Sequence, residues 1–168
     1  GLLSESLGIR IEEYEAIAKE DSYTVICSQG FEGRFTAVHY TDWIKPKAAT
    51  VLASYEDWHM RDFAAATRNG FGKGTGYYVG TVIKEDAFYD ALIADMLKAA
   101  AITPVVTPPP GVEASIRQGG GKRLLFLINH TEAPQTVAVP AGKRELITGK
   151  PTRAELELGV FGVAVVKL

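Results

Sequence analysis

The chain has 168 residues, enough for one ordinary domain or two small ones. Hydrophobic residues make up 46% and charged residues 23%, proportions that are typical of folded globular proteins and that argue against disorder or a collagen-like repeat. The formal net charge of -2 provides no long-range field for nucleic acid or an anionic membrane, so neither partner is expected.

The chain contains one cysteine, Cys27, which cannot form an internal disulfide. The fold therefore does not need an oxidising compartment, and the predicted location is cytoplasmic. No run of apolar residues approaches the ~20 that a transmembrane helix needs, which argues against a membrane protein. Residues 1–4 include neither a basic segment nor an initiator Met, so we expect the chain to begin inside a longer protein.

The first part of the chain is expected to contain several short strands. Runs of apolar and β-branched residues predict strands at residues 9–14, 23–28 and 50–55. The glycines of residues 70–75 permit positive φ, which predicts a β-hairpin with its strands at residues 66–69 and 76–82.

A helix is predicted over residues 86–101. Its apolar residues Phe88, Leu92 and Met96 recur every four positions and should pack on a sheet, whereas polar residues such as Asp95 are expected to face water. Strands interleaved with a helix indicate an α/β domain. The segment up to residue 103 is short for a doubly wound sheet, so we expect this domain to lack its beginning.

A proline-rich segment at residues 104–111 separates two parts of the chain. It fits neither a helix nor a central strand, and we interpret it as a linker between domains at residues 1–103 and 112–168. After it, short strands recur at roughly 10-residue spacing, which predicts a small antiparallel β-sandwich. These strands are predicted at residues 112–117, 124–128, 135–139 and 155–158.

Cys27 is a candidate nucleophile of an amidotransferase-like α/β enzyme, with His39, His59 or His130 as its base. No nucleophile-elbow pattern surrounds it, and a lone cysteine at the end of an apolar strand is typical of a core, so we favour a structural role. The histidines also lack the spacing of metal ligands, so we predict no metal and no cofactor.

Other candidate sites find little support. Lys73 is followed by Gly74, where a phosphate-binding loop needs Ser or Thr, and the glycine-rich stretch leads into a strand. Five glutamates on or beside predicted strands are interpreted as solvated side chains and not as a glycosidase pair. They are Glu12, Glu13, Glu15, Glu155 and Glu157. We therefore predict no catalytic or cofactor-binding residue in the chain.

The aromatic residues bear on the alternative of a carbohydrate-binding accessory module, which would expose flat platforms such as Trp43 or Trp58. We interpret residues 58–62 as a solvated turn with one buried tryptophan. Beyond the proline-rich segment the aromatics are Phe126 and Phe161, both expected in the core. The sandwich is therefore predicted to be structural.

Ordered motifs resemble the end of the trimerisation domain of β-galactosidases of glycoside hydrolase family 42. They are ATVLASY at 49–55, TRN at 67–69, FGKG at 71–74 and YYVGT at 77–81. Further motifs resemble the C-terminal β-domain of the same family. They are GVE at 111–113, LFLINHT at 125–131, LITG at 146–149, LEL at 156–158 and VAV at 163–165.

This resemblance implies a flavodoxin-like, class I amidotransferase-like α/β domain, catalytically silent, that helps to assemble homotrimers. It also implies an N-terminal (β/α)8 barrel, outside this chain, whose two glutamates release terminal β-D-galactose with retention of configuration. In such barrels the acid/base follows an asparagine, whereas Asn69 and Asn129 here precede Gly70 and His130. No catalytic residue is therefore carried over, and the chain alone is expected to be inactive.

Overall fold

The structure of the chain, a computed structural model, describes residues 3–168. The chain divides into two compact units, Gly1–Thr103 and Pro104–Leu168. Strands account for 49% of the residues and helices for 11%, so the protein is built mainly from β-sheet.

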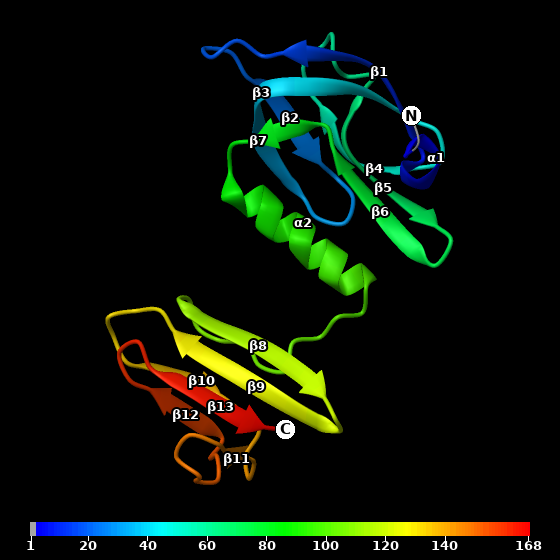
Figure 1. Ribbon diagram of the computed structural model, residues 1–168. Coiled ribbons are helices and arrows are strands. Elements are labelled where there is room, and N and C mark those ends of the chain that lie inside the picture. The colour runs from blue at the N-terminus through cyan, green and yellow to red at the C-terminus, as the bar shows by residue number, and fades with distance from the viewer. Residues whose placement is uncertain (1–2) are drawn as a thin grey trace. The chain divides into compact units, whose positions relative to one another are not determined.

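The first unit contains a seven-stranded sheet in the part of the chain that the structure describes (Figure 1). Its elements are α1 (Ser4–Leu7), β1 (Ile9–Ala16), β2 (Tyr23–Cys27), β3 (Gly33–Pro46), β4 (Thr50–Tyr55), β5 (Ala64–Phe71), β6 (Gly74–Val79), β7 (Thr81–Ile83) and α2 (Asp86–Ala99). The strands lie in the order β1-β3-β2-β4-β5-β6, and β7 pairs with β3. Neighbouring strands of this sheet pair antiparallel.

The flavodoxin-like, amidotransferase-like α/β fold predicted for residues 1–103 is wrong. That fold needs parallel strands, each joined to the next by a crossover helix. The described residues provide one long helix, α2, beside the four-residue α1, and the strands pair antiparallel through short connections. The helix predicted from the apolar periodicity is present, but a single helix does not determine how the strands around it pair.

Several local predictions for this unit are confirmed. The strands predicted at residues 9–14, 23–28 and 50–55 correspond to β1, β2 and β4. The predicted hairpin is formed by β5 and β6. Its second strand, β6, ends earlier than predicted because Gly80 interrupts it. The next strand, β7, pairs with β3 instead. A Cβ atom at Gly80 would lie 2.6 Å from Cδ1 of Ile44, so this crossing leaves no room for a side chain.

Strand β3 was not predicted, although it organises the sheet. Its residues 33–37 pair with β2, and its residues 40–46 pair with β1. Between them His39 has a φ of 70°, and the register with β7 shifts at this position. Near the end of β3, Ile44 pairs with Ala64 of β5, so the sheet curls back on itself.

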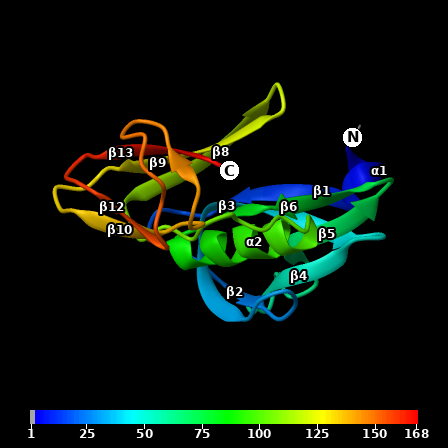
Figure 2. The same ribbon diagram turned by 90° about the horizontal axis from the view of Figure 1, so that it is seen from below.

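Helix α2 covers one face of this sheet (Figures 1 and 2). It ends at Ala99, two residues before its predicted end. Phe88 and Leu92 are buried in a cluster with side chains of the strands, as the periodicity predicts. Met96, expected in the same stripe, is 40% exposed, so the apolar contact of α2 with the sheet is confined to its first half.

The second unit consists of two antiparallel sheets. Its strands are β8 (Val112–Gly119), β9 (Lys122–Asn129), β10 (Gln135–Ala138), β11 (Arg144–Glu145), β12 (Glu155–Leu158) and β13 (Val163–Lys167). One sheet has the order β11-β13-β9-β8 and the other pairs β10 with β12. A shared core of apolar residues, including Leu127, Val137 and Val166, joins them. Val106 of the proline-rich segment lies in this core, so the segment packs on the second unit.

Asp95 fixes the second half of α2 to the sheet, although it was expected to face water. Its side chain is 9% exposed and pairs with Arg68 of β5 at 3.1 Å. It also accepts a hydrogen bond of 2.8 Å from the hydroxyl of Tyr77 in β6. Gly30, in the turn between β2 and β3, approaches the same carboxylate so closely that an added Cβ atom would lie 2.9 Å from its Oδ1 atom.

We expect Gly30→Ala to destabilise the first unit more than Gly72→Ala does. Both glycines have positive φ, which costs an alanine ~1 kcal/mol or more, but nothing lies within 4 Å of the Cβ position at Gly72. At Gly30 the added methyl group also displaces Asp95, so the loss in free energy of unfolding should be ~1 kcal/mol larger. Urea unfolding followed by tryptophan fluorescence reports this unit, because Trp43 and Trp58 both belong to it. Equal losses for the two variants would contradict the tight contact.

Candidate functional site

Cys27, the candidate nucleophile, lies in the core of the first unit. It ends β2 and is 3% exposed, packed in the same apolar cluster as Phe88. Burial raises the pKa of its thiol to about 11, whereas a nucleophilic cysteine needs a lowered pKa and access to solvent. These surroundings oppose the amidotransferase-like reaction and fit the structural role.

The three histidines do not assemble around Cys27. His39 is an exposed residue of β3, and His59 is exposed and packs against the ring of Tyr23 at 5.0 Å. His130, in the second unit, lies 3.2 Å from a carboxylate oxygen of Glu113. Among residues 3–168, no group of three or more His, Cys, Asp or Glu side chains is arranged to hold a metal ion.

The five glutamates singled out by the sequence are separated between the two units. Glu12 and Glu13 are exposed on β1, and Glu155 and Glu157 are exposed on β12. Glu15 is partly buried and accepts a hydrogen bond of 2.7 Å from the hydroxyl of Tyr23. These surroundings match the interpretation as surface side chains.

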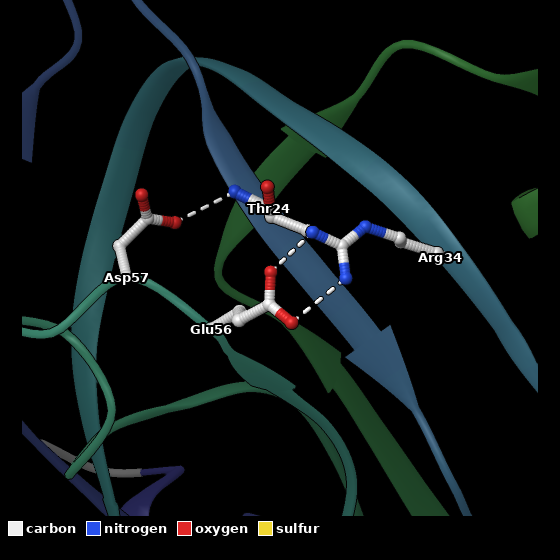
Figure 3. A network of polar contacts seen from close by, with 4 residues as sticks. All are labelled: Thr24, Arg34, Glu56 and Asp57. Atoms are coloured by element: carbon white, nitrogen blue, oxygen red, sulfur yellow. Dashed lines mark hydrogen bonds and ion pairs between the residues drawn. The ribbon is translucent and has the colours of Figure 1, made fainter.

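A polar network lies at the end of β4, where it holds the following turn to two other strands (Figure 3). Arg34 of β3 donates two hydrogen bonds to the carboxylate of Glu56, one of them 2.7 Å long. The backbone N–H of Thr24 in β2 donates a hydrogen bond of 2.7 Å to the carboxylate of Asp57. The hydrogen bond from Arg34 lowers the pKa of Glu56, so this carboxylate stays ionised and paired.

The turn held by this network exposes its tryptophan, contrary to the prediction. Trp58 is 79% exposed, and the buried residue of the turn is Met60. Trp43, the other tryptophan, packs on Phe63 with 5.0 Å between ring centroids and is partly buried. Phe161, expected in the core of the second unit, is 59% exposed.

Glu145 is a buried carboxylate of the second unit that the sequence analysis missed. It is 6% exposed and accepts hydrogen bonds from the backbone N–H groups of Ile147 (2.9 Å), Thr148 (2.6 Å) and Val165 (3.1 Å). The hydroxyl of Thr148 donates a further bond of 2.6 Å. Burial alone would raise the pKa of Glu145, but these four bonds outweigh it and lower the pKa to about 2. The sequence contained one signal for this site. Thr148 and Gly149 follow Glu145 at a spacing that allows the carboxylate to accept hydrogen bonds from its own turn.

Cys27 and Glu145, the buried titratable groups described above, thus stabilise packing and a turn. None of the helices in the described part of the chain is long and apolar enough to span a membrane.

Comparison with known protein families identifies the class of protein to which the chain belongs. The family model described as "Beta-galactosidase trimerisation domain" matches residues 1–103, and the model described as "Beta-galactosidase C-terminal domain" matches residues 111–168. The chain therefore belongs to the β-galactosidases of glycoside hydrolase family 42, and it corresponds to their trimerisation and C-terminal domains.

Individual relatives agree with this family. The chain is 29% identical over 168 residues to β-galactosidase LacZ of Heyndrickxia coagulans, and 31% identical over 171 residues to β-galactosidase BgaB of a Geobacillus species. Each match covers 100% of this chain and 25% of the relative. The crystal structure of β-galactosidase from Bacillus circulans sp. alkalophilus matches with a TM-score of 0.89 and 29% identity, over 99% of this chain and 25% of that one. The chain thus spans about a quarter of the length of the relatives that it matches.

We expect the thiol of Cys27 to resist a thiol reagent such as dithiobis(nitrobenzoate) until the first unit unfolds. With a pKa of about 11, about one thiol in a thousand is ionised at pH 8, and burial blocks access to it. Absorbance of the released thionitrobenzoate measures the rate, with and without urea. Rapid stoichiometric labelling of the folded chain would contradict the buried position.

We expect Glu145→Gln to destabilise the second unit and to remove part of its dependence on pH. The folded pKa of about 2 lies below the ordinary value of 4.5, so the contribution of Glu145 is fully present above pH 4.5 and is lost as the pH falls through 2. The difference corresponds to about 3 kcal/mol. Scanning calorimetry over this range measures the effect, with the exposed Glu155→Gln as the matched control. A variant that keeps the wild-type melting profile would refute this role.

Proposed function

We propose that the chain is the non-catalytic C-terminal part of a bacterial β-galactosidase and serves its structure and oligomerisation. The ordered match of two family models along nearly the whole chain carries this proposal. Coverage of about a quarter of each relative supports it, because the remaining three quarters of those proteins have no counterpart in this chain.

The two units have different roles in this proposal. Residues 1–103 assemble a homotrimer, residues 104–111 act as the linker, and residues 112–168 form a structural β-domain. The description of the matching family model as a trimerisation domain supports the first role. The buried and fully bonded Glu145 supports the last role, because the carboxylate holds a turn together and is closed to a substrate.

The chemistry belongs to the rest of the parent enzyme in this proposal. An N-terminal (β/α)8 barrel packs against this chain and carries a glutamate acid/base and a glutamate nucleophile. It hydrolyses terminal non-reducing β-D-galactose residues with retention, in the cytoplasm. The names of the relatives support a β-galactosidase activity. The buried Cys27 gives no support to an amidotransferase-like activity of the chain itself.

We expect the 168-residue chain to release no nitrophenol from nitrophenyl β-galactoside, because a retaining glycosidase needs two carboxylates about 5 Å apart across the sugar. The full reading frame should hydrolyse the same substrate, and its mass in sedimentation should be three times that of one chain. Hydrolysis by the purified 168-residue chain would refute the non-catalytic role. A full-length protein without activity would refute the assignment of the parent.

A further inference from the structure

We propose that the loops on either side of β11 form a binding site for a small tetrahedral oxyanion, such as phosphate or the phosphate group of an ester. The site is a hollow of about 250 Å³ lined by Gly142, Lys143, Arg144, Gly149 and Pro151. These loops lie at one end of the second unit, where the chain is orange in Figure 1. The hollow belongs to residues 104–168 alone and is independent of the activity proposed for the parent enzyme.

The second unit is basic, although the whole chain is slightly acidic. Residues 104–168 contain eight Lys and Arg residues against five Asp and Glu residues, a formal charge of +3 within a chain of -2. Four of the eight lie in the segment 143–153, which includes most of the residues that line the hollow. A local excess of positive charge attracts anions even where the net charge of the chain does not.

Two cations lie in register beside the hollow. Arg144 of β11 is directly opposite Lys167 of β13. Side chains at such positions point to the same face of the sheet with their Cβ atoms about 5 Å apart, so like charges repel each other. Arg144, Lys167 and Lys143 are exposed, and within residues 3–168 none of them forms an ion pair. An anion bound beside Arg144 would replace this repulsion by charge-assisted hydrogen bonds.

The carboxylate next to Arg144 in the sequence is already engaged. Glu145 is 6% exposed, and its side chain points to the opposite face of β11 from that of Arg144. Its oxygens accept hydrogen bonds from the backbone N–H groups of Ile147, Thr148 and Val165. Glu145 therefore holds its own turn and leaves the cations of the hollow available to an anion from solution.

Two buried polar side chains fix the frame of the hollow. Thr152 is 7% exposed, and its hydroxyl accepts a hydrogen bond of 3.0 Å from the N–H of Lys143 and donates one of 2.7 Å to the carbonyl oxygen of Pro140. The carbonyl oxygen of Thr152 accepts a further bond of 2.8 Å from the N–H of Gly142. Glu145 fixes the second loop through its own turn. Because both loops are held in place, little conformational entropy would be lost when an anion binds.

The surface of the hollow favours a ligand with several acceptor oxygens. Gly142 and Gly149 both have a φ of 73°, and nothing lies within 4 Å of the Cβ position of either residue. Backbone without side chains allows a ligand to approach closely. The guanidinium of Arg144 offers donors in a planar fork, and the ammonium of Lys143 offers three more. Donors of both kinds match the oxygens of a phosphate group.

The test is a titration of the nitrogen-15-labelled 168-residue chain with inorganic phosphate, followed through its amide resonances at neutral pH. Sodium chloride keeps the ionic strength constant, so that general screening does not change. We expect saturating shifts at Gly142, Arg144 and Gly149, with a Kd of about 1 mM. A parallel titration with glycerol 3-phosphate distinguishes the sources of the anion. A lower Kd for this ester indicates a phosphorylated ligand, and a lower Kd for inorganic phosphate indicates the free ion.

Arg144→Gln removes the guanidinium and should raise the Kd for phosphate at least about tenfold. Arg117→Gln is the matched control, because Arg117 is an exposed arginine on β8, at the far edge of the same sheet. This variant should keep the wild-type Kd. Both side chains are exposed, so both variants should melt like wild type without phosphate. Phosphate should raise the melting temperature of wild type and Arg117→Gln more than that of Arg144→Gln.

Three outcomes would overturn the proposal. Shifts that do not saturate up to about 50 mM phosphate would show that no site exists. Equal weakening by Arg144→Gln and Arg117→Gln would show a diffuse attraction to the basic unit. If acetate produces the same shifts as phosphate, the hollow responds to charge alone and does not select a tetrahedral oxyanion. The non-catalytic role of the chain is tested separately, by the nitrophenyl β-galactoside assay.

Discussion

The pairing of β3 with four other strands is the constraint on which the first unit depends. This strand of 14 residues pairs with β1, β2, β5 and β7. It reaches all four because it changes partners along its length, and His39 adopts positive φ where the change occurs. A non-glycine residue in this conformation costs of order 1 kcal/mol, which the surrounding pairings must offset. The curved sheet that results provides the face on which Phe88 and Leu92 of α2 are buried.

The sequence predicted the elements whose pattern is local, and it failed on those that depend on distant partners. Helix α2 and strands β1, β2 and β4 have a periodicity that a short window contains. The first half of β3 meets β2 and the second half meets β1, so no single alternation of apolar and polar residues runs through it. His39 gave no signal, because a glycine would be the usual mark of a bulge with positive φ. A local pattern likewise does not determine whether strands pair parallel or antiparallel. The flavodoxin-like prediction failed for this reason.

The same distinction separates the side chains that the sequence placed correctly from those that it did not. Burial of Cys27 followed from its position at the end of an apolar strand. Asp95 has partners far along the chain, in Arg68 and Tyr77, and its burial becomes visible only when they are in place. Glu145 bonds mostly to its own turn, through Ile147 and Thr148, and its distant partner is Val165. For an isolated carboxylate the surface is the correct expectation. Both residues depart from it because several hydrogen bonds replace the lost water.

Trp58 departs from expectation in the opposite direction, because it was expected to be buried and is 79% exposed. In the turn after β4, the carboxylates of Glu56 and Asp57 are bonded to neighbouring strands, whereas the indole is directed to solvent. The core position of the turn is taken by Met60, which is fully buried. Local sequence could not show this choice, because which side chain of the turn reaches the core depends on the bonds that Glu56 and Asp57 make to β3 and β2.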